Sequence, residues 1–295
     1  MTAAGPVNLV VADATNRAGR RKWWWRMQPD PRPLSPRDVV AFKERGERFV
    51  MLTAYDYPSA RILDAAGVPV LLVGDSVGDN VLGYPSTVPV TMADMIHHTR
   101  AVRQGTQRAV VVADLPFMSY QVSVEDGLRN AGRLLQEGGA AAVKVEGGAR
   151  VVDLATRLVQ IGIPVMGHLG LTPQSVHQMG HRVQGRTAAA ADTIVADAQA
   201  LADAGVFAIV LEAVPADLAR RVTEAVAVPT IGIGAGPHTD AQVMVLHDLL
   251  GLSTGHRPRF VKPYADLRAT ITDAVKSYQA EVVAGEYPAT EHTYG

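Results

Sequence analysis

The sequence predicts an α/β protein in which eight parallel strands close into a (β/α)8 barrel, and three observations lead to this fold class. From about residue 49 onward, apolar β-branched runs alternate with helical patterns. The 295 residues exceed the roughly 250 that one such barrel requires. Five of the apolar runs end on a possible acid, base or ligand, as strands do at the mouth of a barrel. An open doubly wound sheet is the alternative.

The expected strands follow one another at short intervals along the chain. Their ranges are 50–54, 70–75, 110–114, 142–146, 164–168, 208–212, 228–231 and 259–262. Helical spacing occupies residues 60–66, 189–204, 216–225, 242–250 and 265–284. Two further helices should begin after Thr91 and Ser123, since an aspartate follows each of these N-cap residues three positions later.

Two loops differ from ordinary βα connections. The polar segment 170–186 is longer than the usual connection of about 2–6 residues, which indicates a lid or a binding loop. Residues 232–236 are rich in glycine and resemble a phosphate cradle after the seventh strand. Tight turning or the close approach of a ligand explains those glycines equally well.

Composition excludes several classes of function. The chain has a formal charge of −1, so it lacks the excess of basic residues that is typical of proteins that bind nucleic acid. It has no cysteine, so disulfides, thiolate catalysis and cysteine-ligated metals are excluded. No apolar run approaches the roughly 18 residues of a membrane span, so no stable membrane association is expected. The lack of an export signal favours the cytoplasm.

Residues 1–34 differ in character from the rest of the chain. They lack periodicity and contain three consecutive tryptophans, residues 23–25, among basic residues, followed by several prolines. We expect a disordered N-terminal extension here, with residues 35–295 forming one barrel domain. A true start at Met27 and a contact of the tryptophans with a membrane interface are the alternatives.

Three carboxylates, Asp75, Asp114 and Glu146, end the second, third and fourth expected strands. Neighbouring strands lie about 5 Å apart, so these anions repel one another unless a cation neutralises them. Oxygen ligands without cysteine suit Mg²⁺. The alternative is that each carboxylate caps the following helix or pairs with an arginine. Their occurrence on consecutive strands favours the metal site.

Four more residues complete the candidate site. Lys144 lies two positions before the fourth-strand carboxylate, so both point into the barrel, where Lys144 could bind a substrate carboxylate or a neighbouring acid. Ser76 can offer a hydrogen bond to the same ligand. Glu212 ends the sixth strand and is a general base or a partner in a salt bridge. His168 ends the fifth strand and is an acid, a base, a ligand or a structural hydrogen-bonding residue.

Short motifs between residues 48 and 294 occur in a characteristic order. They are Thr53-Ala54-Tyr55-Asp56, Val73-Gly74-Asp75-Ser76, Ala113-Asp114-Leu115-Pro116-Phe117, Lys144-Val145-Glu146-Gly147-Gly148, residues 167–175, Val183-Gln184-Gly185-Arg186, residues 231–236 and Glu291-His292-Thr293-Tyr294. In this order they resemble the ketopantoate hydroxymethyltransferase family. The chain departs from that family at Met179-Gly180-His181, where many members have a Gly-Gly-aromatic stretch, and in its tryptophan-rich extension.

The resemblance implies a fold, an activity and a set of roles. The fold is a barrel of the phosphoenolpyruvate/pyruvate type. The activity is hydroxymethyl transfer from 5,10-methylenetetrahydrofolate to 3-methyl-2-oxobutanoate, giving 2-dehydropantoate for pantothenate and coenzyme A biosynthesis, by way of a Mg²⁺-stabilised enolate. A cytoplasmic homodecamer is also implied. The roles implied are metal ligands Asp75, Asp114 and Glu146, oxoacid contacts Asp75, Ser76, Asp114 and Lys144, and proton acceptor Glu212.

Two rival functions share parts of this pattern. A Mg²⁺-dependent lyase or phosphonomutase of the same barrel group would use similar enolate chemistry, but those lyases generally carry a cysteine in a catalytic loop and this chain has none. A catalytically silent barrel acting as a sensor or scaffold is the other rival. The presence of every proposed ligand and of the base argues against it.

Overall fold

The computed structural model describes residues 32–253 and 257–294. The chain divides into two compact units, residues 1–32 and 33–295. Nearly all of the expected N-terminal extension, residues 1–31, lies outside the described residues. Every helix and strand of the described residues belongs to the second unit.

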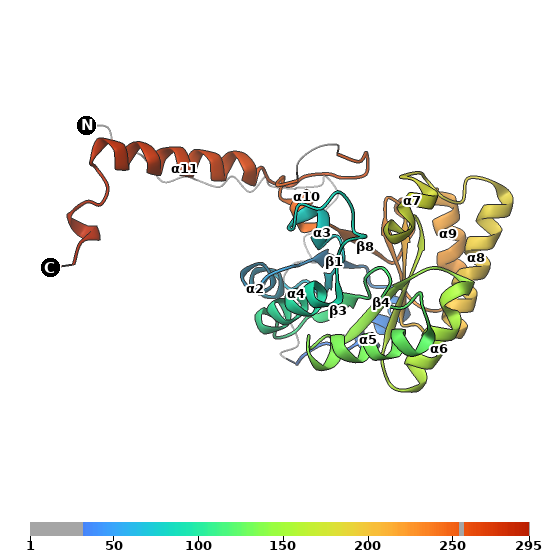
Figure 1. Cartoon of the computed structure of the whole chain (residues 1–295). Helices are drawn as coiled ribbons and strands as arrows, with labels where there is room; N and C mark the ends of the chain where they lie inside the picture. Colours follow the sequence, from blue (N-terminus) through green and yellow to red (C-terminus); the bar gives the residue numbers. More distant parts are fainter. Residues whose placement is uncertain (1–31, 254–256, 295) are drawn as a thin grey trace. The chain divides into compact units, whose positions relative to one another are not determined.

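Eight parallel strands close into a barrel in sequence order, with β8 pairing back to β1, and this confirms the predicted fold class (Figure 1). Seven of the strands lie within a few residues of their predicted ranges. The strands are β1 (Phe49–Thr53), β2 (Val70–Val73), β3 (Val110–Asp114), β4 (Ala142–Glu146), β5 (Val165–Gly170), β6 (Ala208–Glu212), β7 (Thr230–Ile233) and β8 (Ala241–Met244).

Helices connect most of the strands around the outside of the barrel. They are α1 (Pro36–Glu44), α2 (Tyr57–Ala65), α3 (Val77–Asn80), α4 (Met92–Gly105), α5 (Val124–Gln136), α6 (Val152–Gln160), α7 (Val176–Met179), α8 (Ala188–Asp203), α9 (Ala216–Ala225), α10 (Leu246–Leu249) and α11 (Leu267–Ala284), with 3₁₀ turns η1 (Ala149–Val151), η2 (Pro173–Ser175) and η3 (Thr290–His292). The predicted N-caps are confirmed, because Thr91 and Ser123 accept hydrogen bonds from the backbone N–H groups of Asp94 and Asp126.

The alternation of side chains along the strands produces two hydrophobic cores. Outward-facing residues such as Leu71 and Val111 pack against the helices. Inward-facing residues such as Val70 and Val112 fill the barrel, and Val39 of α1 packs with them. A polar residue that continues the inward series therefore lies above the inner core, at the carboxyl ends of the strands.

The prediction of the eighth strand at 259–262 is wrong, and the helix expected at 242–250 is confirmed only over α10 (Leu246–Leu249). β8 is Ala241–Met244, which pairs with both β7 and β1. It has only four residues and Gln242 is exposed, so it is too short for periodicity to separate a strand from a helix. Residues 234–240 connect β7 to β8 without a helix.

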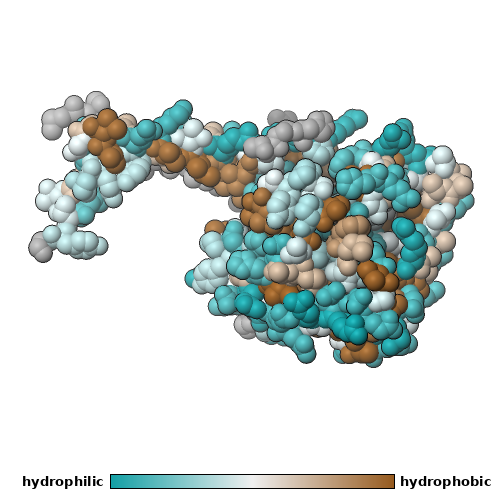
Figure 2. Space-filling view, in the orientation of Figure 1, coloured by the Kyte–Doolittle hydropathy of each residue, from teal (hydrophilic) through white to brown (hydrophobic). Residues whose placement is uncertain are grey.

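Helix α11 confirms the helix expected at 265–284, but none of its residues is buried. Side chains with apolar surface follow helical spacing along it and stay exposed: Ile271, Val275, Tyr278 and Val282. Figure 2 shows brown, hydrophobic surface along this helix. Among the residues that the structure describes, no helix is long and apolar enough to cross a membrane.

Candidate active site

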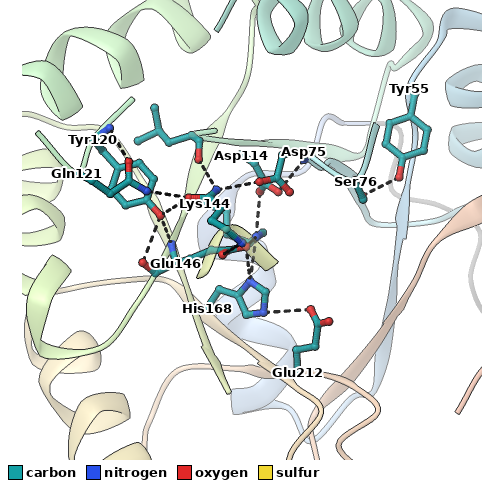
Figure 3. Close-up of polar contacts among 12 residues, drawn as sticks. Tyr55, Asp75, Ser76, Asp114, Tyr120, Gln121, Lys144, Glu146, His168 and Glu212 are labelled. Atoms are coloured by element: carbon teal, nitrogen blue, oxygen red, sulfur yellow. Dashed lines mark hydrogen bonds and ion pairs between the residues drawn. The ribbon is translucent and has the colours of Figure 1, made fainter. Parts of the chain in front are cut away.

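The seven candidate residues converge at the carboxyl ends of the strands, as Figure 3 shows. Asp114, Lys144, Glu146 and His168 are buried members of β3, β4 and β5. β2 ends at Val73, two residues earlier than expected, so Asp75 belongs to the turn that follows it. All of them line one cavity of about 650 Å³, together with Ser76 and Glu212.

Lys144 lies at the centre of the buried charges. Its Nζ is 3.2 Å from Asp114 Oδ1, 3.8 Å from Glu146 Oε1 and 3.1 Å from His168 Nδ1. Burial works to lower the pKa of Lys144, but the surrounding carboxylates outweigh burial and raise it. The lysine therefore remains a cation at the floor of the cavity.

Asp75 and Asp114 form a closely spaced pair of acids. The backbone N–H of Asp75 donates to Asp114 Oδ2 at 3.1 Å. Burial raises the pKa of both carboxyl groups, that of Asp75 well above its usual range, and repulsion between the acids adds to the rise at Asp75. Asp114 Oδ1 forms an ion pair with Lys144 but receives no aligned hydrogen bond from the described residues. A further positive charge beside Asp75 and Asp114 would therefore stabilise the ionised form of both carboxyl groups.

His168 connects the buried carboxylates to Glu212. Its Nδ1 is 3.3 Å from Glu146 Oε1, and its Nε2 is 3.3 Å from Glu212 Oε2. Burial and the Lys144 ammonium act to lower the pKa of His168, but the contacts with Glu146 and Glu212 prevail and raise it to about 9. The Glu212 side chain is 19% exposed, so it reaches the open part of the cavity. His168 therefore lies between the two carboxylates and contacts both of them.

The residues present fit a hard divalent cation. Three buried carboxylates face one lysine, and Asp75 and Asp114 bring carboxylate oxygens together at the wall of the cavity. Residues 32–253 and 257–294 contain no set of three His, Asp or Glu side chains already arranged around one point. Glu146 instead contacts His168 and the backbone N–H of Gln174. Asp75 and Asp114 could therefore hold such an ion through carboxylate oxygens, the ligand type that Mg²⁺ prefers.

Three site residues had no predicted role. Gln174 Nε2 donates to Asp75 Oδ2 at 2.9 Å, and Tyr120 contacts both Gln174 and the backbone of Glu146. The Tyr55 hydroxyl is 2.8 Å from Ser76 Oγ. Gln174 and Tyr55 occur within the motifs that resemble the family, and this is the sequence signal that could have identified them. Their hydrogen-bond partners could not be read from the sequence, because they depend on the folded structure.

The two unusual loops also lie at the cavity. Residues of the long segment 170–186, among them Val176 and His181, line it. The glycine-rich segment after β7 does not lead into a helix, so it offers no helix N-terminus to a phosphate. Gly234 has φ +61°, and a Cβ there would come within 2.7 Å of the Phe260 ring. Close packing accounts for this glycine.

Comparison with known proteins shows the family to which the chain belongs. A family model described as ketopantoate hydroxymethyltransferase matches residues 34–290. The 3-methyl-2-oxobutanoate hydroxymethyltransferase of Moorella thermoacetica is 61% identical over 257 residues, which cover 87% of this chain and 96% of that protein. The enzyme of the same name from Chloroflexus aurantiacus is 57% identical over 260 residues, covering 88% and 92%.

Solved structures resemble the barrel at much lower identity. 2,3-Dimethylmalate lyase, a member of the PEP mutase/isocitrate lyase superfamily, has a TM-score of 0.56 and 18% identity, covering 88% of this chain and 91% of that one. Phosphonopyruvate hydrolase in complex with oxalate and Mg²⁺ has a TM-score of 0.55 and 12% identity, covering 88% and 93%. These likenesses concern the fold, while the family match and the close relatives extend over most of the sequence. The chain belongs to the ketopantoate hydroxymethyltransferase family.

Proposed function

We propose that this protein transfers a hydroxymethyl group from 5,10-methylenetetrahydrofolate to 3-methyl-2-oxobutanoate and forms 2-dehydropantoate. The observation that carries the proposal is the arrangement of Glu212 and His168 at one side of the cavity with the Asp75–Asp114 pair and Lys144 at its floor. Glu212 and His168 can move a proton. The residues at the floor can hold an anionic 2-oxoacid together with a cation.

Each residue has a task that its surroundings support. The buried Lys144 ammonium would bind the carboxylate of the oxoacid, and Ser76, held by Tyr55, would add a hydrogen bond. Asp75 and Asp114 would hold Mg²⁺, with Glu146 contributing through its contacts with His168 and Lys144. Bound Mg²⁺ would supply Lewis-acid polarisation of the 2-oxo group.

Glu212 would accept the proton from C3 of the oxoacid. Glu212 lines the cavity and contacts His168, a second group that can exchange protons. Removal of the C3 proton leaves an enolate, and its carbon would form the new bond to the one-carbon unit. Water would supply the hydroxyl oxygen of the product, while the bonds from the one-carbon unit to the folate nitrogens break and tetrahydrofolate leaves with the protons.

Replacing Glu212 by glutamine tests this assignment. The amide preserves size but cannot accept the C3 proton, and a general base typically contributes about 10²–10⁴-fold. Exchange of the C3 proton in D₂O, followed by NMR, and product formation should therefore fall together by about that factor. Binding of Mg²⁺ and of the oxoacid should persist. Glu224→Gln, on the exposed surface of α9, is the matched control and should behave as wild type.

The outcome that contradicts the assignment is specific. Exchange at the wild-type rate in Glu212→Gln, with only hydroxymethyl transfer lost, would place Glu212 in the folate half of the reaction. His168 would then be the first candidate for the base. Loss of Mg²⁺ binding in the same variant would show that Glu212 belongs to the metal site.

A homodecamer in the cytoplasm remains the prediction for the state of the protein in the cell. The exposed apolar residues of α11 support association, because an 18-residue helix without a buried side chain gains stability when its apolar face is covered. Light scattering on the purified protein measures the assembly size directly.

A further inference from the structure

Gln174 is a buried, uncharged residue that touches two of the acids in the site. It lies in η2, four residues after the end of β5, and its side chain is 5% exposed. Its Nε2 donates to Asp75 Oδ2 at 2.9 Å, and its backbone N–H donates to Glu146 Oε2 at 3.1 Å. One residue thus holds one oxygen of each carboxylate.

The amide of Gln174 is fully hydrogen-bonded, and its partners fix its orientation. The second Nε2 hydrogen goes to the carbonyl oxygen of Leu115 at 2.9 Å. Oε1 accepts from the Tyr120 hydroxyl at 2.8 Å and from Gln121 Nε2 at 2.9 Å. A flipped amide would face the Leu115 carbonyl with an oxygen and Gln121 with an NH₂ group, so only one orientation satisfies the network.

The amide also supplies donors without supplying charge. A lysine or arginine in this position would neutralise Asp75 and would compete with a cation for it. A neutral donor orients the carboxylate and leaves its negative charge in place. The pattern matches the outer shell of metal sites, in which the groups that ligate the ion are themselves held by hydrogen bonds.

We propose that Gln174 is a positioning residue that orients Asp75 and Glu146 for the cation and, in doing so, ties the segment 170–186 to the metal site. This inference rests on the proposed function. Gln174 holds Asp75 Oδ2 and Glu146 Oε2, so the other oxygen of each acid stays available to the ion, to Lys144 or to His168. Gln174 lies within the same segment as Leu171, Pro173, Val176 and His181, which line the cavity.

The test replaces Gln174 by methionine, which has a similar length and no donor. The backbone bond to Glu146 survives this change, whereas the bond to Asp75 is lost. Titration calorimetry on the metal-free protein should show Mg²⁺ affinity reduced by about 10–100-fold. C3 exchange should regain most of its maximal rate at saturating Mg²⁺, and its pH profile should be unchanged because Glu212 is untouched.

Two further variants keep the test decisive. Gln184→Met is the matched control: it lies in the same segment, is only partly buried, and donates from Nε2 to the carbonyl of Arg182, so its Mg²⁺ affinity should be that of wild type. Tyr120→Phe removes a partner of Gln174 Oε1, and with it the contact of the same hydroxyl with the Glu146 backbone, without altering a carboxylate. It should weaken Mg²⁺ binding in the same direction by a smaller factor, and it decides the question if Gln174→Met does not fold.

Hydrogen exchange tests whether Gln174 ties the segment 170–186 to the metal site. Mg²⁺ should increase the hydrogen-exchange protection of residues 172–180 in the wild type and in Gln184→Met, but not in Gln174→Met. Unchanged Mg²⁺ affinity in folded Gln174→Met, or in Tyr120→Phe if the first variant does not fold, would overturn the positioning role while leaving the proposed function intact. Failure of the wild type to bind Mg²⁺ would overturn both.

Discussion

At the scale of single residues, the site is an extension of the inward-facing series of the strands. Each of these polar residues lies two or four positions after a residue of the inner core: Asp114, Lys144, Glu146, His168 and Glu212. Period-two alternation therefore predicts their convergence from sequence alone. Gln174 could not be found in this way, because its bond to Asp75 spans 99 residues and depends on tertiary structure.

Asp75→Asn should make the metal-free protein more stable. Burial and the neighbouring acids raise the pKa of Asp75, so its ionisation opposes folding. The sign follows from linkage: a carboxyl group with a raised pKa in the folded state costs stability as pH rises above its unfolded value near 4. A pKa that is one unit higher in the folded state corresponds to about 1.4 kcal/mol. Asparagine removes this loss at pH 7 and also removes a proposed ligand.

Thermal unfolding in EDTA and in Mg²⁺ measures both effects of this substitution. The variant should melt at a higher temperature than wild type in EDTA at pH 7, and the difference should shrink toward pH 4. Mg²⁺ should raise the melting temperature of the wild type but not that of the variant. A lower melting temperature in EDTA would show that the Asp75 charge stabilises the empty site.

At the scale of elements, local signals were sufficient where an element is long or capped. The helices after Thr91 and Ser123 were predictable because the cap and its partner lie within one turn. Seven strands were predictable from apolar runs bounded by turn residues. β8 was not, because four residues with one exposed glutamine carry little periodicity and its identity comes from pairing with β1 and β7. The helix α1, which contributes Val39 to the inner core, was also missed.

Asp64→Ala should destabilise the junction between α4 and β3. Asp64, in α2, accepts hydrogen bonds from the backbone N–H groups of Gln107, Arg108 and Ala109 at 2.7–3.3 Å. Alanine would leave these donors to water or unpaired, at a cost of about 2 kcal/mol, since a hydrogen bond to a charged group contributes about 1.5–3 kcal/mol. Urea unfolding checks the value.

The control for this prediction is another aspartate on a helix surface. Asp217→Ala removes an exposed ion pair with Arg220, and such pairs contribute about 0–1 kcal/mol. Equal stability of Asp64→Ala and Asp217→Ala would mean that solvent replaces Asp64 at these N–H groups without loss.

At the scale of the whole second unit, the two ends of the barrel differ in role: one closes the inner core and the other carries the candidate site. The amino-terminal end is closed by α1, whose Lys43 bonds to the carbonyl oxygens of Thr223 and Val228 and to Asp240. The carboxyl-terminal end carries the charges above an apolar inner core. This separation lets the site accumulate repelling acids, because the energy that holds the strands together comes from the two cores and not from the site.

Deleting residues 1–32 should leave the enzyme active. The sequence predicts that residues 1–34 are dispensable, and Leu34 contacts the barrel through its N–H, which donates to the carbonyl of Arg108 at 2.8 Å. Ser35 then starts α1 through its reciprocal bonds with Asp38. A chain that begins at Pro33 keeps both features, so C3 exchange, melting temperature and assembly size by light scattering should match those of the full chain. A chain that begins at Pro36 loses the N-cap and should be less stable by about 1 kcal/mol. A large fall in activity or assembly size for the chain beginning at Pro33 would show that the N-terminal residues belong to the working structure.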